Sequence, residues 1–176
     1  MKQNDNLVRA IRTAANIGLW GTMFFGLLAV AEHYMAEYVW ARTIVTNTYT
    51  HDLLLYGGWV LVVADIAIIL FTVRRQIPRI RQFDAVEEKL SRYKGLVQSV
   101  YYSSLIVSII VCAAIVITNE STLLMLLLLL FITLVLSFPN MYKMKVDCGL
   151  NDQEMKELFG DSYISDNGGG PENAEE

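Results

Sequence analysis

Four uninterrupted apolar blocks constrain this chain more than any other feature. They cover residues 14–30, 53–73, 99–118 and 121–138. A helix that rises about 1.5 Å per residue needs about 20 apolar residues to cross a hydrocarbon layer about 30 Å thick. The blocks therefore predict four transmembrane helices in a chain of 176 residues, which has room for a single domain.

Burial in lipid explains these blocks better than burial in a soluble core. Asp65 is the only formal charge inside them, and 54% of all residues are hydrophobic. Soluble core helices would show a polar face every three or four residues, and transmembrane strands would alternate apolar with polar residues. The predicted fold class is an all-α integral membrane protein, a transmembrane bundle of four helices built from two helical hairpins.

The positions of the basic residues predict the orientation of the bundle. Thirteen of the fourteen Lys and Arg residues lie in the N-terminal arm, in the loop 74–98 or after residue 138, and the first external loop holds only Arg42. Loops rich in Lys and Arg stay in the cytoplasm. We therefore expect both termini in the cytoplasm and the protein in the cell membrane, specifically a bacterial inner membrane.

A cleavable signal peptide is the alternative interpretation of the first block. A basic arm, an apolar run and the small residues Ala29 and Ala31 fit such a peptide, and cleavage would leave three spans. The run is longer than the usual apolar core of about 7 to 15 residues, and helix-compatible sequence continues through Met35. We favour a first span that is retained.

Two amphipathic elements are predicted on the cytoplasmic side. Apolar residues at alternating three- and four-residue spacing predict a helix in the middle loop that runs into the third span: Phe83, Val86, Leu90, Tyr93 and Val97. After Pro139, the juxtamembrane segment 139–160 contains a capping box at Asn151 and Glu154, which predicts a short helix that ends at Gly160. The Gly-rich, acidic residues 161–176 predict a disordered tail.

Small and polar residues predict which faces of the spans point inward. A four-residue repeat lines the first block with Ala10, Ala14, Gly18, Thr22 and Gly26, and Ser104, Ser108 and Cys112 line the third. We favour packing within the chain over dimer contact for the first stripe. In the fourth block, Thr133 and Ser137 are predicted to face inward and Leu123 to Leu130 to face lipid.

Asp65 is the sharpest candidate for a functional residue. It lies about 12 Å into the predicted hydrocarbon, where a charge costs about 2.5 to 3.5 kcal/mol on insertion scales. Thr22, Ser104 and Ser108 are expected at comparable depth, so these four residues define a hypothetical intramembrane polar site. The site serves either proton or cation transport or the assembly of the bundle. We favour assembly because no Lys or Arg lies in any span.

A metal or redox site is the third hypothesis, and it rests on four residues of the external side: His33, Glu37, His51 and Asp52. Imidazole and carboxylate ligands suit zinc and other divalent ions. Solvated histidines at the loop ends are the favoured interpretation. The two histidines are also the only candidates for axial haem ligands, and both lie outside the apolar blocks, so we expect no cofactor.

The leading functional hypothesis is a non-enzymatic interaction or accessory subunit. No nucleotide-binding, hydrolase, metalloprotease or kinase motif is present, the two cysteines form no disulfide framework, and the net acidity gives no support to nucleic-acid binding. The expected partners are the lipid bilayer, another membrane or cytoplasmic protein, and a second copy of the chain. The predicted partner-binding residues are Phe83, Leu90, Met155, Leu158 and Phe159.

Overall fold

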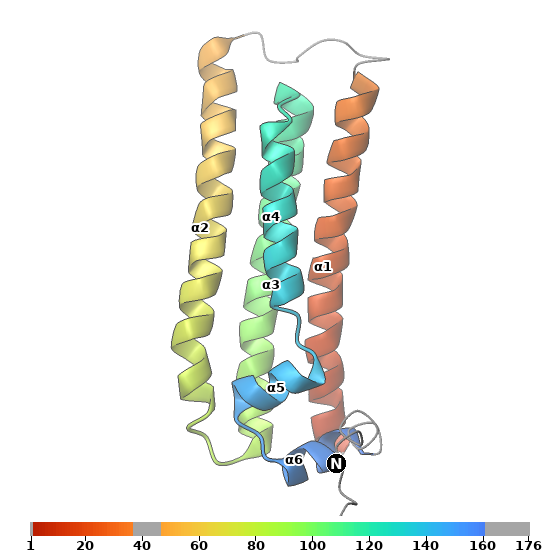
Figure 1. The fold of residues 1–176 in the computed structure, drawn as a ribbon, viewed down its shortest axis with the longest axis vertical. Helices are drawn as coiled ribbons and strands as arrows, with labels where there is room; N and C mark the ends of the chain where they lie inside the picture. The colour runs from red at the N-terminus through yellow and green to blue at the C-terminus, as the bar shows by residue number, and fades with distance from the viewer. Residues whose placement is uncertain (1, 37–46, 161–176) are drawn as a thin grey trace, which may run out of the picture.

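The fold is all-helical over the part of the chain that the structure, a computed structural model, describes, namely residues 2–36 and 47–160. The six helices of this part are α1 (Lys2–Ala36), α2 (Thr48–Ile80), α3 (Val86–Thr118), α4 (Thr122–Leu136), α5 (Met141–Cys148) and α6 (Asp152–Phe159). The first four run side by side, and α5 and α6 lie across one end of them (Figure 1). The all-α part of the predicted fold class is confirmed.

Three of the helices, α1, α2 and α3, are long and apolar enough to cross a membrane. Helix α4 has 15 residues and is about 22 Å long at the usual rise, which is too short to cross a membrane alone. It becomes long enough only together with α5, and the two helices are bent by 74° at the break between them. The bend lies at Pro139, whose ring prevents the preceding residue from continuing a helix. The described residues therefore hold three candidate spans, or four if the bent pair is one span.

The middle of the chain is more helical than the sequence suggests. Helix α2 continues past the predicted span to Ile80, a short turn follows at residues 81–85, and α3 begins at Val86. The amphipathic helix expected in the middle loop is thus the first part of α3 itself. At the opposite end, a tight turn at Asn119 and Glu120 joins α3 to α4.

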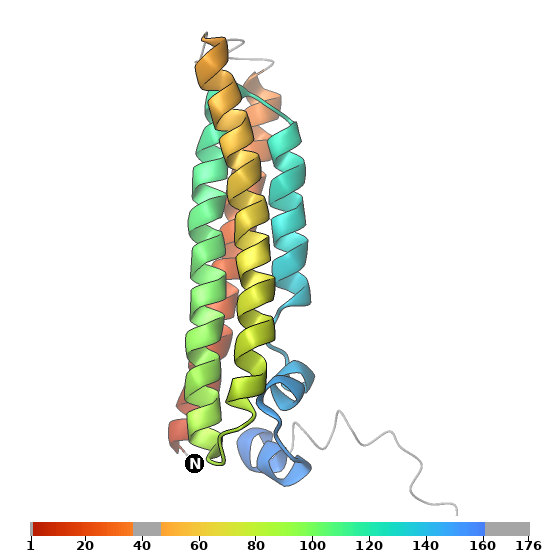
Figure 2. The same cartoon turned by 90° about the vertical axis from the view of Figure 1, so that its left-hand side faces the viewer.

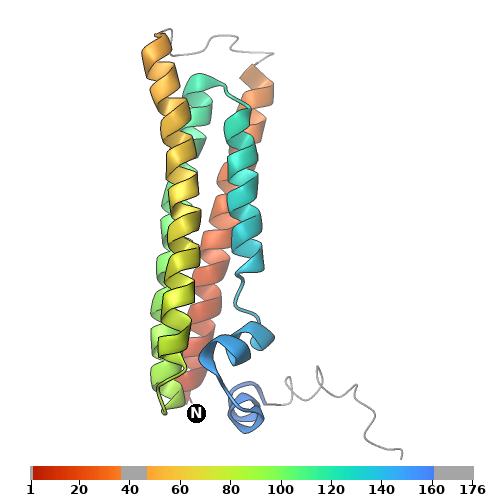
Figure 3. The same ribbon diagram turned by 60° about the vertical axis from the view of Figure 1, so that its left-hand side comes forward.

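Helices α1 and α2 do not form the helical hairpin that we expected. Each packs chiefly on α3, and the contact between α1 and α3 is the most extensive of any helix pair. Figure 1 shows α3 and α4 between α1 and α2 over most of their length, and Figure 3 shows the same four helices from a second side. Since eleven residues separate the end of α1 from the start of α2, their connection does not force the two helices together. The helix-compatible sequence after the first block continues α1 to Ala36, and residues 37–46 lie outside the described residues.

The contact between α1 and α3 depends on small residues. Gly18 of α1 lies so close to α3 that a Cβ atom built on it would be 2.5 Å from Cβ and 2.8 Å from the backbone oxygen of Tyr101. Ala14 and Thr22 of the same stripe are buried, and Oγ1 of Thr22 lies 3.3 Å from the hydroxyl of Ser108 on α3. The stripe of α1 therefore serves packing within the chain up to Thr22, while a Cβ at Gly26 would meet nothing within 4 Å.

The prediction that residues 123–130 of α4 face lipid is wrong for four of them, whereas Ser137, predicted to face inward, lines a cavity between the helices. The buried residues of this helix are all leucines, Leu123, Leu126, Leu127, Leu130 and Leu134. Thr133 instead donates a hydrogen bond to the backbone oxygen of Leu129 one turn earlier, which satisfies its hydroxyl without a neighbouring helix. Because leucine is as stable against lipid as against protein, a Leu-rich helix carries no signal for its inward face.

Helices α5 and α6 fold back under the bundle (Figure 2), and we call this end of the molecule the α6 end. Asn140 caps α5 by accepting a hydrogen bond from the backbone N–H of Lys143, and Gly149 ends the helix with a φ of 61°. The capping box predicted for α6 is confirmed, since the side chains of Asn151 and Glu154 each accept from the backbone N–H of the other. The predicted disordered tail, 161–176, lies outside the described residues.

Candidate functional site

The first candidate site surrounds Asp65 in the middle of the bundle. Gly58, Val62, Asp65 and Ile69 form the buried face of α2, with the three- and four-residue spacing of a helix seam. Asp65 is 6% exposed, and its Oδ2 accepts a hydrogen bond of 2.8 Å from the hydroxyl of Ser104 on α3. The carboxyl thus occupies a position that an apolar residue would normally fill.

Hydroxyl groups extend this site to α1. Ser108 lies one turn beyond Ser104 on α3, and its hydroxyl lies 3.3 Å from Oγ1 of Thr22 and 2.8 Å from the backbone oxygen of Ser104. The structure therefore brings together all four residues of the hypothetical intramembrane site, from three different helices. We call this group the Asp65 cluster.

The geometry of the Asp65 cluster indicates what it can do chemically. No ion pair joins Asp65 to any Lys, Arg or His of the described residues, and every fully buried side-chain nitrogen or oxygen of that part has a hydrogen-bond partner. A polar residue at one position of an apolar seam fixes the register of two helices, because any shift leaves it without a partner. The cluster can therefore hold α1, α2 and α3 at one relative height.

A second buried polar site lies at the α6 end, and the sequence analysis missed it. The phenol of Tyr93 on α3 donates a hydrogen bond of 3.0 Å to Oδ2 of Asp147 on α5. Lys89, one turn earlier on α3, is 7% exposed, and its Nζ donates to the backbone oxygen of Gly149 at 3.4 Å. In the sequence, Tyr93 belongs only to an apolar stripe. Asp147 is 54 residues away, and the spacing of residues along the chain does not indicate that the two side chains meet.

Burial determines the protonation of this second site. It raises the pKa of the Asp147 carboxyl, and the hydrogen bond from Tyr93 and the charges of Lys143 and Arg81 offset only part of that effect. Burial also raises the pKa of the neighbouring Cys148 thiol to about 12. Both groups are therefore held toward their protonated forms while α5 stays in place.

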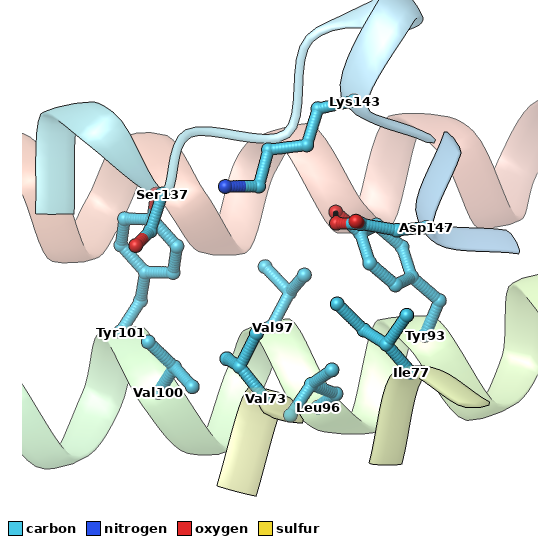
Figure 4. Close-up of a pocket in the computed structure, with 10 residues that line it drawn as sticks. All are labelled: Val73, Ile77, Tyr93, Leu96, Val97, Val100, Tyr101, Ser137, Lys143 and Asp147. Carbon is cyan, nitrogen blue, oxygen red and sulfur yellow. Dashed lines mark hydrogen bonds between the residues drawn. The ribbon is translucent and has the colours of Figure 1, made fainter. Parts of the chain in front are cut away.

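A cavity of about 30 Å³ lies beside Tyr93 and Asp147, between α2, α3 and α5 (Figure 4). Val73 and Ile77 of α2 form part of its apolar wall, and Lys143 extends across it toward the end of α4, where its Nζ donates to the backbone oxygen of Leu136 at 3.1 Å. A cavity of this size has room for one or two water molecules. It is too small for an organic substrate.

The predicted partner-binding residues lie at the same end, and most of them are not available to a partner. Leu90 and Met155 are fully buried, and Leu158 is 9% exposed. They hold α6 and the start of α3 against the chain's own core. Phe83 and Phe159 are half-buried, and a guanidinium lies 5.4 Å from each ring, from Arg92 and Arg12 respectively.

The histidines of the hypothetical metal site interact with the turn between α3 and α4. Nδ1 of His33 lies 2.7 Å from Oδ1 of Asn119, which has a φ of 55°. Nε2 of His51 lies 3.3 Å from a carboxylate oxygen of Glu120, and its Nδ1 lies 3.6 Å from Asp52.

Of the other proposed ligands, Glu37 lies outside the described residues. The described residues hold no group of three or more potential metal ligands. The metal site remains a prediction.

Comparisons with known proteins add no assignment. No family model, curated protein or solved structure matches the chain.

Proposed function

We propose that the protein spans a cell membrane four times, with the α6 end in the cytoplasm, and acts there as a non-enzymatic interaction or accessory subunit. One observation carries the orientation. The start of α1, the end of α2, the turn 81–85, the start of α3, and α5 and α6 all meet at the α6 end (Figure 1), and these segments hold thirteen of the fourteen Lys and Arg residues. Basic residues concentrated on one side of a bundle favour the cytoplasmic side.

The proposed interaction surface differs from the one expected from the sequence. Because Leu90, Met155 and Leu158 are buried, the partner contact moves to exposed side chains around them. The most basic stretch is the end of α2 and the residue that follows it, where four arginines are exposed: Arg74, Arg75, Arg79 and Arg81. We call it the arginine end of α2. Exposed charges at the edge of an interface select a partner of opposite charge and accelerate its binding. The proposed partner therefore presents an acidic surface.

The fixed position of α5 and α6 supports this proposal. Met144, Cys148 and Met155 are fully buried under the bundle. A surface that is already formed before binding loses less conformational entropy when a partner arrives. The α6 end therefore suits recognition, and the cavity beside Asp147 is too small for a substrate.

Affinity purification in mild detergent tests the proposal. Arg75→Gln together with Arg79→Gln removes two charges from the arginine end, and Arg92→Gln together with Lys156→Gln removes two other exposed charges of the α6 end as a control. We expect the first pair to reduce the amount of at least one co-purifying protein that the control pair retains. Equal retention by wild type and both variants contradicts the interaction surface.

A second candidate function is proton or cation transport through the Asp65 cluster. The supporting observation is a buried carboxyl that contacts hydroxyls instead of a cation of the described residues. Asp65→Asn keeps the size and hydrogen-bonding capacity of the side chain but cannot ionise. Reconstituted into vesicles with an internal pH dye, an active wild type should lose its flux on this change. Flux that is unchanged in a well-folded Asp65→Asn variant eliminates transport at this residue.

A further inference from the structure

A second basic feature of the α6 end is a groove between α1 and the joint that connects α4 to α5. It has a volume of about 420 Å³ and is lined by Arg12, Phe138, Pro139, Asn140, Met141 and Tyr142. We call it the Arg12 groove. In Figure 1 the start of α5 lies near the lower part of α1, and residues of both helices line the groove.

Arg12 is held in this groove by an aromatic ring from a third element. Its guanidinium lies 5.4 Å from the centre of the Phe159 ring of α6, a distance at which a cation is attracted to the ring face. Arg9, one turn earlier on α1, is exposed on the same side of the helix. One positive charge, that of Arg12, therefore lines the groove in a defined position, and a second, that of Arg9, lies outside its lining.

The distribution of charge distinguishes the Arg12 groove from its neighbour. A second groove, of about 380 Å³, lies on the other side of Arg12 and is lined partly by Arg9 and Asp5. The Asp5 carboxylate repels an anion there. The residues that line the Arg12 groove include a cation and no carboxylate, so this groove is the better place for an anion.

The groove also lies at the depth of lipid headgroups. Arg12 precedes the first apolar block by two residues, and Phe138 is the last residue of the fourth block, so both mark the level at which the apolar spans end. Tyr142 on the opposite wall is 76% exposed, and tyrosine is a residue typical of the membrane–water interface. Basic pockets between helices on the cytoplasmic side are suited to anionic lipid headgroups.

We propose that the Arg12 groove binds the headgroup of an anionic phospholipid of the cytoplasmic leaflet, with the lipid phosphate on the guanidinium of Arg12. A guanidinium presents a planar pair of N–H donors that matches two phosphate oxygens. Arg9 adds attraction at longer range. The proposal rests on the membrane orientation given above, and it uses none of the residues of the arginine end of α2.

Native mass spectrometry of the full chain tests the proposal. The protein is extracted in detergent with equal amounts of phosphatidylglycerol and phosphatidylcholine, and the lipids that remain bound are counted. Arg12→Gln is compared with Arg92→Gln, whose guanidinium also lies 5.4 Å from a phenylalanine ring but lines none of the three cavities described here. We expect wild type and Arg92→Gln to retain phosphatidylglycerol preferentially, and Arg12→Gln to bind it on the order of five-fold more weakly.

A second variant distinguishes loss of lipid binding from misfolding of Arg12→Gln. Tyr142→Glu changes an exposed side chain on the opposite wall and adds a negative charge, so it should reduce phosphatidylglycerol binding while the melting temperature stays unchanged. Equal binding of the two lipids by wild type, or unchanged phosphatidylglycerol binding in both Arg12→Gln and Tyr142→Glu, overturns the proposal. Because co-purification depends on other residues, a lost lipid site and a lost protein partner are distinguishable.

Discussion

Tyr93 of α3 and Asp147 of α5 are joined by a buried hydrogen bond of 3.0 Å between the phenol and Oδ2 of the carboxyl. This bond links the bundle to the first of the two helices that lie across its end. The apolar contacts of Met144 and Met155 support the same arrangement but have no preferred direction. The hydrogen bond therefore sets the orientation of α5 under the bundle.

Tyr93→Phe should weaken the attachment of α5 to the bundle. The change leaves a buried carboxyl without one of its donors, which costs about 1 to 3 kcal/mol. We expect a lower melting temperature in detergent, measured by intrinsic fluorescence. Tyr102→Phe changes an exposed tyrosine of the same helix and should leave the melting temperature within error of wild type. Equal effects of the two changes would contradict a special role for Tyr93.

The raised pKa of Asp147 predicts a stability that depends on pH. The folded protein holds this proton more tightly than an exposed Asp, whose pKa is about 3.9. The resulting contribution is fully present below that value and is lost as the pH rises through the higher pKa of the folded state. Melting temperatures between pH 4 and pH 8 should therefore fall less steeply in Asp147→Asn than in wild type. Parallel curves would show that another group controls the pH dependence.

Cys148 should be inert toward thiol reagents in the folded protein. Its thiol is fully buried and has a pKa raised to about 12, so the unreactive protonated thiol dominates at pH 8. In a Cys112→Ala background, we expect slow modification by a water-soluble maleimide and a rate that increases in Tyr93→Phe, because α5 then detaches more often. Rapid modification of Cys148 in the otherwise wild-type chain would mean that α5 does not stay docked.

Gly18 should not tolerate a side chain, whereas Gly26 should. A Cβ on Gly18 would meet the backbone of Tyr101, so Gly18→Ala must push α1 away from α3 at a cost of about 1 to 3 kcal/mol. Gly26→Ala meets nothing within 4 Å and should be neutral or should stabilise the helix by up to about 1 kcal/mol. Unfolding in mixed micelles measures both changes, and a neutral Gly18→Ala would be inconsistent with this interface.

Ser104→Ala removes the donor to Asp65 and should lower the free energy of unfolding. Hydrogen bonds between helices in a membrane contribute about 0.6 kcal/mol on average and about 1.7 kcal/mol at most. Thr133→Ala, which removes a hydroxyl that bonds only within its own helix, is the control. If Thr133→Ala and Ser104→Ala cost the same, the contact between Asp65 and Ser104 contributes nothing measurable.

The Asp65 cluster shows what the sequence predicts well. Depth along an apolar block follows from residue number, because a helix rises by a constant amount per residue. Counting from the block ends therefore groups Asp65, Thr22 and Ser104, and the structure brings them together. The capping box at Asn151 and Glu154 is equally local, since it needs only four consecutive residues.

Contacts that depend on how the chain folds back are not visible in the sequence. Nothing near Asp147 indicates that Tyr93 lies opposite it, because the direction of α5 depends on the bend of 74° after α4. Leu90 and Met155 illustrate a related failure. An apolar stripe predicts that a helix face is buried, but it does not distinguish burial by a partner from burial by the chain itself.

The small contact between α1 and α2 has a consequence for biosynthesis in the proposed membrane placement. These two helices leave the ribosome first, yet each finds its main partner only when α3 has been made. Until then, Asp65 lies in α2 without the hydroxyl of Ser104, at a cost of about 2.5 to 3.5 kcal/mol at the centre of a bilayer. Nascent chains that end before residue 104 should thus remain next to the insertion machinery, and release into lipid should follow the synthesis of α3.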